Sequence, residues 1–373
     1  MKKLVSSPIL LPFVMLATLV VGIKANPVQA KATLLSLYTR SDAVMVARYD
    51  KKADVGTNRV NDGFMIVTTR TSYEVSSVLK GDVEKFITIE NEEFRYQVQK
   101  GNKAPQDAIF SIDGGSKNDD APKPGDTVIL FLKKEADSFV LADETDGVRK
   151  VTSADQSIIA DRINELNSVF EKGSADPAKV AAWLVKCVEN QSTRWDGTHE
   201  LLTGFRHIEW NDQKDADIYS RIDPSVAYEK GMDAAKALDE NLKTTLTQIL
   251  VSSNFSPDSF KAGKLSDGDR ELIVLVKRWD PATAANYLLS QLKSGAFTAN
   301  ENAGMMFKVS ALIDDANSEK LSVRYANLTA AEANDEVSNV KTTASADPKI
   351  GVMQNFIRTA DAQVNKMIAA QSN

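Results

Sequence analysis

The stretch GVRKVTSADQSIIADRINELNSVF, residues 147–170, is where the chain changes from one structural class to another. Residues 147–152 are typical of a short strand. From Ser153 onward, apolar side chains recur at helical spacing, and Ser153 with Gln156 forms a capping-box pattern. The apolar stripe consists of Ile158, Ile159, Ile163, Leu166, Val169 and Phe170. We therefore expect a β-rich part before residue 153 and a helical part after it.

Upstream of this boundary the sequence has strand patterns. In residues 63–81, for example, Val67, Thr69, Thr71 and Tyr73 share one face by strand alternation. A small closed antiparallel barrel would suit such a set, because closure leaves no exposed sheet edge. The expected strands cover 42–50, 63–81, 85–93, 125–135, 138–143 and 147–152.

Four segments of the β-rich part carry a resemblance to a known family. They are SDAVMVARY (41–49), SYEVSSVLKGDV (72–83), KPGDTVILFL (123–132) and SFVLAD (138–143). Together they resemble the N-terminal module of secreted bacterial proteins of unknown role. That module is similar to the OB-like barrel of tissue-inhibitor-of-metalloproteinase and netrin-type domains. The resemblance covers residues 36–150 and implies an OB-like fold. The inhibitors act through an N-terminal cysteine, which this region lacks, so no inhibitory residue is carried over.

A long insertion, residues 91–126, interrupts the expected strands and is interpreted as a loop. Phe94 and Tyr96 lie in it and are candidate binding residues, because long loops on a rigid scaffold often carry binding. Its aspartates do not follow the alternating order of a calcium loop, so a solvated tip is the preferred interpretation.

Downstream, five helix starts are predicted where an aspartate or serine precedes a proline: 176–177, 223–224, 256–257, 280–281 and 347–348. Further starts are expected at Ser266 and near Asn300. The starts follow no fixed period, so we expect an irregular all-α array or bundle rather than a solenoid. The residues 333–347 are interpreted as a polar linker. The overall prediction is α+β in separate domains: a signal peptide (1–30), an OB-like β-barrel domain (31–152) and an α-helical domain (153–373).

The first thirty residues are typical of a secretory signal peptide. Lys2 and Lys3 precede an uncharged apolar run at 9–23, which is too short to span a bilayer. Small residues suit cleavage in two registers: Val28 with Ala30, or Ala30 with Ala32. We expect a periplasmic or secreted protein with no membrane span in its mature chain.

The charge of the chain limits its possible partners, and its cysteine content limits its disulfide bonds. The formal net charge of −6 becomes more negative when the lysines of the signal peptide leave, so nucleic acid is a poor candidate partner. The single cysteine, Cys187, forms no internal disulfide and has the spacing of a buried helical residue.

Both histidines lie in THELLTGFRHIEW, residues 198–210. On one helix His199 and His207 would be about 12 Å apart, too far to share a zinc ion. Gly204 is expected to end that helix, which would leave residues 205–210 extended and put His207 and Glu209 on one face. The preferred interpretation is a helix end with Trp195, Phe205 and Trp210 packed into the core of the domain. The alternative hypothesis is a small aromatic-lined pocket at Trp195, His207, Glu209 and Trp210.

No catalytic motif is present: the sequence contains no G-x-S-x-G, no phosphate-binding loop and no G-x-G-x-x-G. No catalytic, cofactor-binding or metal-binding residue is assigned. The preferred hypothesis is an exported non-catalytic binding or scaffold protein whose partner is a protein or an envelope component. The alternative is an exported carboxylate-based hydrolase with its site between the two domains.

Overall fold

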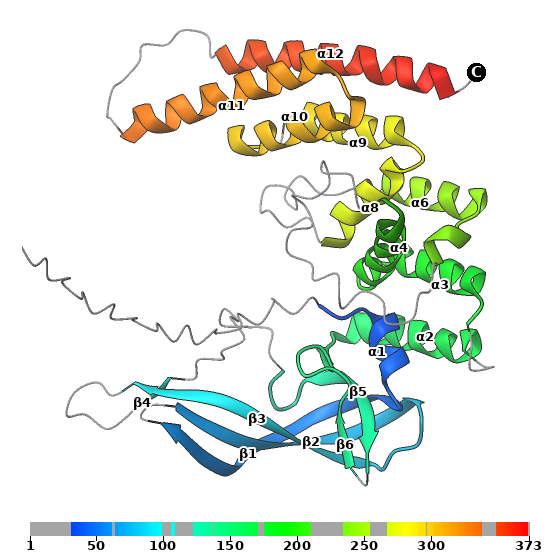
Figure 1. The fold of residues 1–373 in the computed structure, drawn as a ribbon, viewed down its shortest axis with the longest axis vertical. Helices are drawn as coiled ribbons and strands as arrows, with labels where there is room; N and C mark the ends of the chain where they lie inside the picture. Colours follow the sequence, from blue (N-terminus) through cyan, green and yellow to red (C-terminus); the bar gives the residue numbers. More distant parts are fainter. Residues whose placement is uncertain are drawn as a thin grey trace, which may run out of the picture.

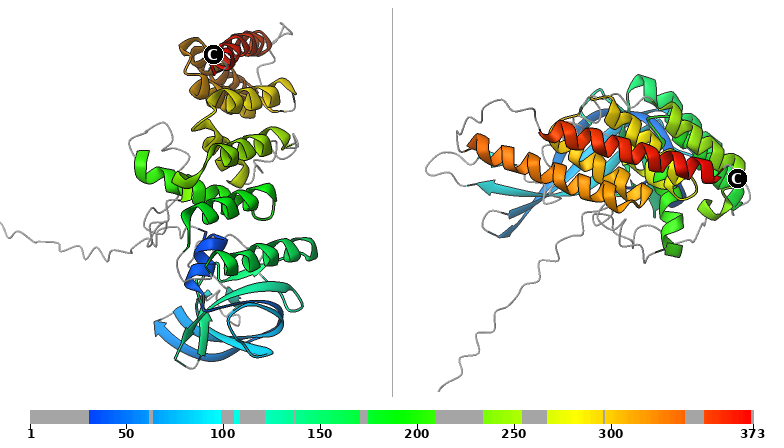
Figure 2. Two further views of the ribbon diagram at one scale, coloured as in Figure 1. Left: turned by 90° about the vertical axis from the view of Figure 1, so that its right-hand side faces the viewer. Right: turned by 90° about the horizontal axis from the view of Figure 1, so that it is seen from above.

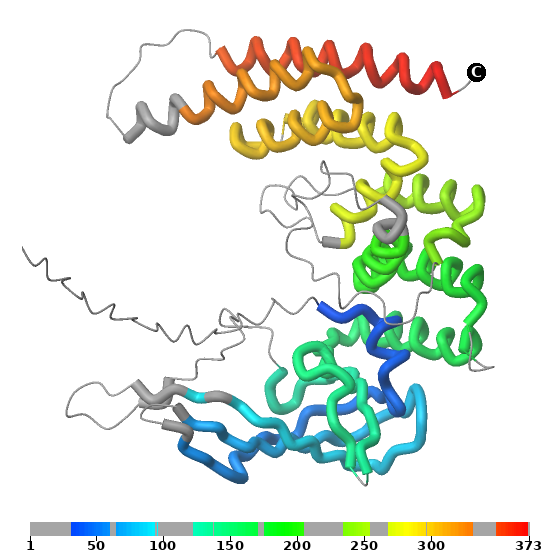
Figure 3. The backbone as a smooth tube through the Cα atoms, viewed as in Figure 1, coloured from blue at the N-terminus to red at the C-terminus, as the bar shows by residue number. Residues whose placement is uncertain are grey.

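The computed structural model describes residues 31–61, 64–98, 106–108, 122–136, 138–170, 175–209, 234–253, 267–295, 297–337 and 348–371 (Figure 3). It is an α+β structure in which an antiparallel sheet precedes a succession of helices (Figure 1). The sheet lies at one end of the molecule, and helices α11 (Ala316–Val337) and α12 (Pro348–Gln371) lie at the other. Among the described residues, no helix is both long and apolar enough to cross a membrane.

The sheet contains every strand expected from the sequence. Its strands pair in the order β4-β3-β2-β1-β5-β6, and β7 pairs with β5. Two strands run further than expected, and β4 lies inside the stretch 91–126 that was interpreted as a loop. That interpretation is therefore wrong for the residues of β3 and β4. The strands are β1 (Ala43–Asn61), β2 (Phe64–Lys80), β3 (Phe86–Val98), β4 (Gln106–Ala108), β5 (Thr127–Glu135), β6 (Ser138–Leu141) and β7 (Val148–Lys150).

The sheet curls but stays open. In the described part of the chain, no backbone ladder joins β6 to β3 or β4. The closed barrel expected from the strand pattern is therefore not confirmed. Strands β3 and β6 nevertheless come close to one another, which brings the two sides of the curl together.

Alternate residues of β1 serve two different hydrophobic clusters. Met45 and Ala47 belong to a cluster formed by strands β1, β2, β3 and β5. Val44 and Val46 belong to a larger cluster that also contains residues of the helices. Strand β5 is divided in the same way, which explains why residues 128–132 are a continuous apolar run: both faces of the strand are buried.

A short helix, α1 (Leu34–Arg40), precedes the sheet and was not predicted. Thr33 caps it, because its side chain accepts a hydrogen bond from the backbone N–H of Ser36. The helix contacts α2 (Ser153–Val169) and β5, and the Tyr38 hydroxyl donates to Asn167 on α2 at 2.7 Å. It therefore lies between the sheet and the first helix of the helical part.

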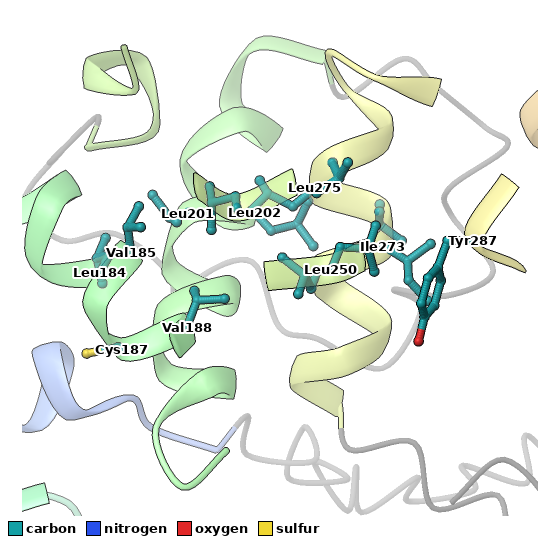
Figure 4. Close-up of a cluster of buried hydrophobic side chains, with 14 of the residues drawn as sticks. Leu184, Val185, Cys187, Val188, Leu201, Leu202, Leu250, Ile273, Leu275 and Tyr287 are labelled. Carbon is teal, nitrogen blue, oxygen red and sulfur yellow. The ribbon is translucent and has the colours of Figure 1, made fainter. Parts of the chain in front are cut away.

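Successive helices pack against one another as the chain moves away from the sheet (Figures 1 and 2). A single hydrophobic cluster extends from α1 and the sheet to α12, and Figure 4 shows its middle, where side chains of α3, α4, α6, α8 and α9 meet. The other elements among the described residues are α3 (Pro177–Glu189), α4 (Arg194–Glu209), η2 (Ala234–Ala237), α6 (Glu240–Ser252), α8 (Asp267–Lys277), α9 (Pro281–Lys293) and α10 (Ala299–Ile313).

Most predicted helix starts within the described residues are confirmed. Asp176 and Asp280 cap α3 and α9, each followed by proline at the start of the helix. The helices expected near Ser266, Asn300 and Pro348 begin at Asp267, Ala299 and Pro348. The starts expected at 223–224 and 256–257 lie outside the described residues.

Three helix boundaries differ from the expectation. The cap of α2 is Thr152, not Ser153, and its side chain accepts from the backbone N–H of Asp155. Helix α4 does not end at Gly204 but continues to Glu209. A Cβ atom on Gly204 would lie 2.9 Å from the Cβ of Ala235, so this glycine permits close packing on η2 rather than ending a helix. Helix α11 continues to Val337, into the expected linker.

Candidate functional site: a buried polar junction on helix α4

Helix α4 carries an unusual set of buried polar side chains. Each is less than a tenth exposed, although α4 lies at the centre of an apolar cluster. Buried polar groups are costly unless they are bonded, so the partners of these side chains show what they do. The set consists of Arg194, Asp196, Thr198, His199, Glu200 and Thr203.

The first group joins α4 to the segment Ala32–Leu34, which we call the N-terminal strap. Asp196 accepts a hydrogen bond from the backbone N–H of Leu34 at 2.7 Å. The Thr33 hydroxyl donates to Glu200. The backbone N–H of Ala32 donates to Asp146, in the turn before β7. The strap is thus held by carboxylates from both the helical part and the sheet.

Arg149 on β7 completes this junction. Its Nη2 atom lies 3.0 Å from the Asp196 carboxylate, and the same nitrogen donates to the carbonyl of Ala32. The side chains of Arg149 and Asp196 are 14% and 3% exposed. An ion pair this well buried is little screened by solvent, and it ties the sheet directly to the first turn of α4.

The second group centres on His199. Its Nδ1 atom lies 2.9 Å from the Glu271 carboxylate of α8, and the other oxygen of that carboxylate accepts from Thr198 at 3.2 Å. The imidazole stacks on Trp195 with ring centroids 4.8 Å apart. The Lys31 ammonium lies 4.9 Å from the centroid of the Trp195 ring, within cation–π range.

The third group fixes α4 against α3 and α8. Arg194 pairs with Asp269 at 2.7 Å, and its Nε atom donates to the carbonyl of Val188 at 3.0 Å. The backbones of α4 and α8 also lie close together at this point. A Cβ on Gly268 would lie 2.6 Å from the backbone nitrogen of Trp195, so only glycine fits there without a shift.

The chemistry available at this junction is mainly that of bonding and orientation. Asp146, Asp196, Glu200 and Glu271 each accept at least one hydrogen bond from the protein. Among the described residues, no three histidine, cysteine, aspartate or glutamate side chains form a group that could hold a metal ion. The His199–Glu271 pair has the geometry of a base and its orienting carboxylate, but its stacking on Trp195 and its burial also suit a purely structural role.

Cys187 lies on α3 and is fully buried. Burial raises the pKa of its thiol well above the usual range, since the thiolate would lose its hydration. Reactive cysteines have lowered pKa values and partial exposure, so Cys187 is a core residue, as its spacing predicted.

The predicted pocket residues lie at different places on the fold. Trp195 is in the first turn of α4, whereas His207 and Glu209 lie at the other end of that helix. Trp195 and His207 are twelve residues apart in one helix, which corresponds to about 18 Å along its axis. The extended conformation expected for residues 205–209 is wrong, and on a helix His207 and Glu209 do not share a face. Trp210 lies outside the described residues.

The other two candidates, Phe94 and Tyr96, lie on β3 and not in a loop. The strand register pairs Phe94 with Ile66, and Tyr96 with Phe64 on one side and Ala108 on the other. These positions therefore belong to the far end of the sheet, away from the α4 junction.

The sequence interpretation missed the main partners of the junction. It did not single out Thr33, Arg149, Glu271 or Asp269, because each meets α4 from a distant part of the chain. The one signal in the local sequence was the polar composition of α4, because polar side chains in a buried helix need bonding partners.

The chain matches no protein-family model, no curated protein and no solved structure.

Proposed function

We propose that the protein is exported and acts as a non-catalytic binding protein or scaffold that presents the far end of its sheet to a protein partner. The compartment is the periplasm or the extracellular medium. Export is supported by the basic start, the apolar run at 9–23 and the small residues that follow it. As part of the same proposal, the sheet is of the OB-like class, which its curl and the approach of β3 to β6 support.

The single observation that carries the proposal is the ribbon formed by β1, β2 and β3 beyond the point where β1 stops pairing with β5. The ribbon comprises residues 51–61, 64–71 and 89–98. Its ladders continue to the pairs Asn61–Phe64 and Phe64–Tyr96. Residues 51–59 of β1 are exposed, apart from a half-buried Gly56. On β2, by contrast, Val67, Thr69 and Thr71 are buried, so β2 forms a firm base from which the exposed residues of β1 are presented outward.

Ion pairs between β1 and β3 stiffen this ribbon. Arg95 binds Asp54 at 2.6 Å and Glu93 at 3.0 Å, and Lys52 also pairs with Glu93. All four residues lie on β1 or β3, with β2 between these strands, so the Arg95–Asp54 and Lys52–Glu93 pairs bridge the full width of the ribbon. A surface held rigid before binding loses less conformational entropy when a partner docks.

The alternative of a carboxylate-based hydrolase has less support. It requires two carboxylates free to act on a substrate between the sheet and the helices. At that place Asp146, Asp196 and Glu200 are engaged by the N-terminal strap, and Asp196 also by Arg149.

Site-specific photo-crosslinking in cells would test the proposal. A crosslinking residue at Val55, which is 45% exposed on the ribbon, should give a discrete adduct with a protein partner. The control position is Val251, which is 59% exposed. It belongs to α6, a helix that lies far from the ribbon (Figure 1). The double variant Phe94→Ser/Tyr96→Ser should reduce the Val55 adduct.

Three results would count against the proposal. They are an adduct from Val251 but not from Val55, a Val55 adduct unchanged in the double variant, and retention of the protein in the cytoplasm. Circular dichroism of the double variant shows whether the sheet still folds.

A further inference from the structure

The N-terminal strap is buried from its first residue. Ala32, Thr33 and Leu34 are 3%, 3% and 0% exposed, whereas Lys31 just before them is exposed. The backbone of Ala32 is bonded in both directions: its N–H donates to Asp146, and its carbonyl accepts from Arg149. Ala32 is therefore a structural part of the junction, and the transition from solvent to core falls between residues 31 and 32.

This transition bears on the two cleavage registers that the sequence leaves open. Cleavage after Ala32 would delete both of its backbone bonds. It would also leave a charged ammonium on Thr33, which is buried and caps α1. The helix dipole opposes a positive charge at that position, whereas the nearby carboxylates of Asp196 and Glu200 favour it, so the main cost of this register is the loss of the two Ala32 bonds.

Cleavage after Ala30 has neither cost. It keeps every bond of the strap and places the new ammonium on an exposed residue. It also suits the sequence, with Val28 and Ala30 as the small residues before the scissile bond.

We propose that the leader is removed between Ala30 and Lys31, and that the mature chain is anchored by docking its new N-terminus in the junction formed by α4 and β7. The inference rests on the proposed export. The step is hydrolysis of one peptide bond by a signal peptidase: water adds across the Ala30–Lys31 amide, leaving a carboxylate on Ala30 and an ammonium on Lys31.

The surroundings of the new ammonium are complementary to it. Asp146 binds the amide of the next residue, so the ammonium forms one residue away from this carboxylate. Burial raises the pKa of Asp146, and a neighbouring positive charge would act in the opposite direction by favouring the carboxylate. The Lys31 side chain already lies against Trp195 on α4. Removal of the leader thus adds a positive charge close to the Asp146 carboxylate of the junction.

Intact mass and N-terminal sequencing of the exported protein, produced from the full chain, would test the inference. We expect a mature chain that begins with Lys31. A chain that begins with Thr33, or at any other residue after export, would overturn the cleavage site while leaving the proposed function standing. An unprocessed chain that stays in the cytoplasm would overturn the proposed export and the inference with it.

A second measurement tests the anchoring role by itself. Two purified forms, one beginning with Lys31 and the other with Thr33, would be compared by thermal unfolding, with a form that begins at Ala32 as the intermediate control. The Thr33 form should unfold several degrees below the Lys31 form. Equal midpoints would mean that Ala32 contributes nothing to the junction, and the structural argument for the cleavage site would fail.

Discussion

Replacing Asp196 by alanine is expected to destabilise the protein more than any exposed charge substitution, because Asp196 serves both sides of the junction. Its carboxylate accepts the N–H of Leu34 at 2.7 Å and pairs with Arg149 at 3.0 Å. The variant would leave the guanidinium of Arg149, which is 14% exposed, without its carboxylate. Removal of one partner from a buried pair typically costs about 3–5 kcal/mol, so we expect a loss of that size in the free energy of unfolding.

Two further variants show how much of this loss comes from the charge of Asp196 and how much the loss of an exposed ion pair would cost. Asp196→Asn keeps an oxygen for the Leu34 N–H but removes the charge, so its loss should be smaller, about 1.5–3 kcal/mol. Glu90→Ala is the matched control, because Glu90 pairs with Arg70 where both side chains are about half exposed. Exposed pairs contribute about 0–1 kcal/mol.

Urea unfolding followed by tryptophan fluorescence and by circular dichroism would measure these losses. Since one hydrophobic cluster joins the sheet to the helices, the two signals of the wild-type protein should change together. The reasoning would be refuted if Asp196→Ala cost no more than Glu90→Ala. It would also be refuted if the two signals of the wild-type protein unfolded separately.

Three other predictions concern close packing, burial and the ribbon. Gly268→Ala should destabilise by about 1–3 kcal/mol, because its Cβ would lie 2.6 Å from the Trp195 nitrogen. Gly304→Ala on α10 meets nothing within 4 Å and should stabilise by about 0.5–1 kcal/mol; thermal unfolding that ranks the two the other way would contradict this. Cys187 should resist iodoacetamide until urea unfolds the chain, because burial raises the pKa of its thiol; rapid labelling of the native protein would show the burial to be wrong. Arg95→Ala should return the pKa of Asp54 toward its ordinary value, since the hydrogen bond from Arg95 is the main cause of its lowering. In the wild type, the stability gained from this lowering is present above the usual aspartate pKa and is lost as the pH falls through the lowered one. An NMR titration that finds the same Asp54 pKa in both proteins would rule out the interaction.

The parts of the fold that could be predicted from the sequence are those set by neighbouring residues. Asp176 and Asp280 cap their helices because a side chain two or three positions away from a free N–H reaches it whatever the rest of the chain does. The apolar run at 128–132 likewise identified a buried strand from neighbouring residues alone.

Other elements could not be predicted because their local signals are weak or ambiguous. The extension of β1 through residues 51–61 has no apolar alternation, since most of its residues face solvent and its pairing with β2 holds it in place. Helix α1 is only seven residues long and follows directly after the predicted leader. Gly204 resembles a helix stop in the sequence, but the nearby Ala235 gives it a packing role.

The candidate site is harder still, because its pairs join distant residues. His199 and Glu271 are 72 positions apart, and Thr33 and Glu200 are 167 apart. The sequence interpretation paired His207 with Glu209 because they are close in the chain, whereas the bonds at the junction depend on tertiary contacts. The sequence carries one signal for this site: a helix with Thr198, His199 and Glu200 in succession needs polar partners if it is to be buried.

The polar content of α4 also bears on how the protein holds its shape. Apolar contacts bury surface without strong directional preference, so a cluster of leucine and valine residues tolerates several relative orientations of a sheet and a helix. Hydrogen bonds and ion pairs are directional: Asp196 and Glu200 on α4 bind the strap and β7, and Glu271 on α8 binds His199 on α4. They therefore select one orientation among those that the core would allow. If the ribbon binds a partner as we propose, its direction relative to the helical part is set at this junction, so substitutions there should weaken partner binding without contacting the partner.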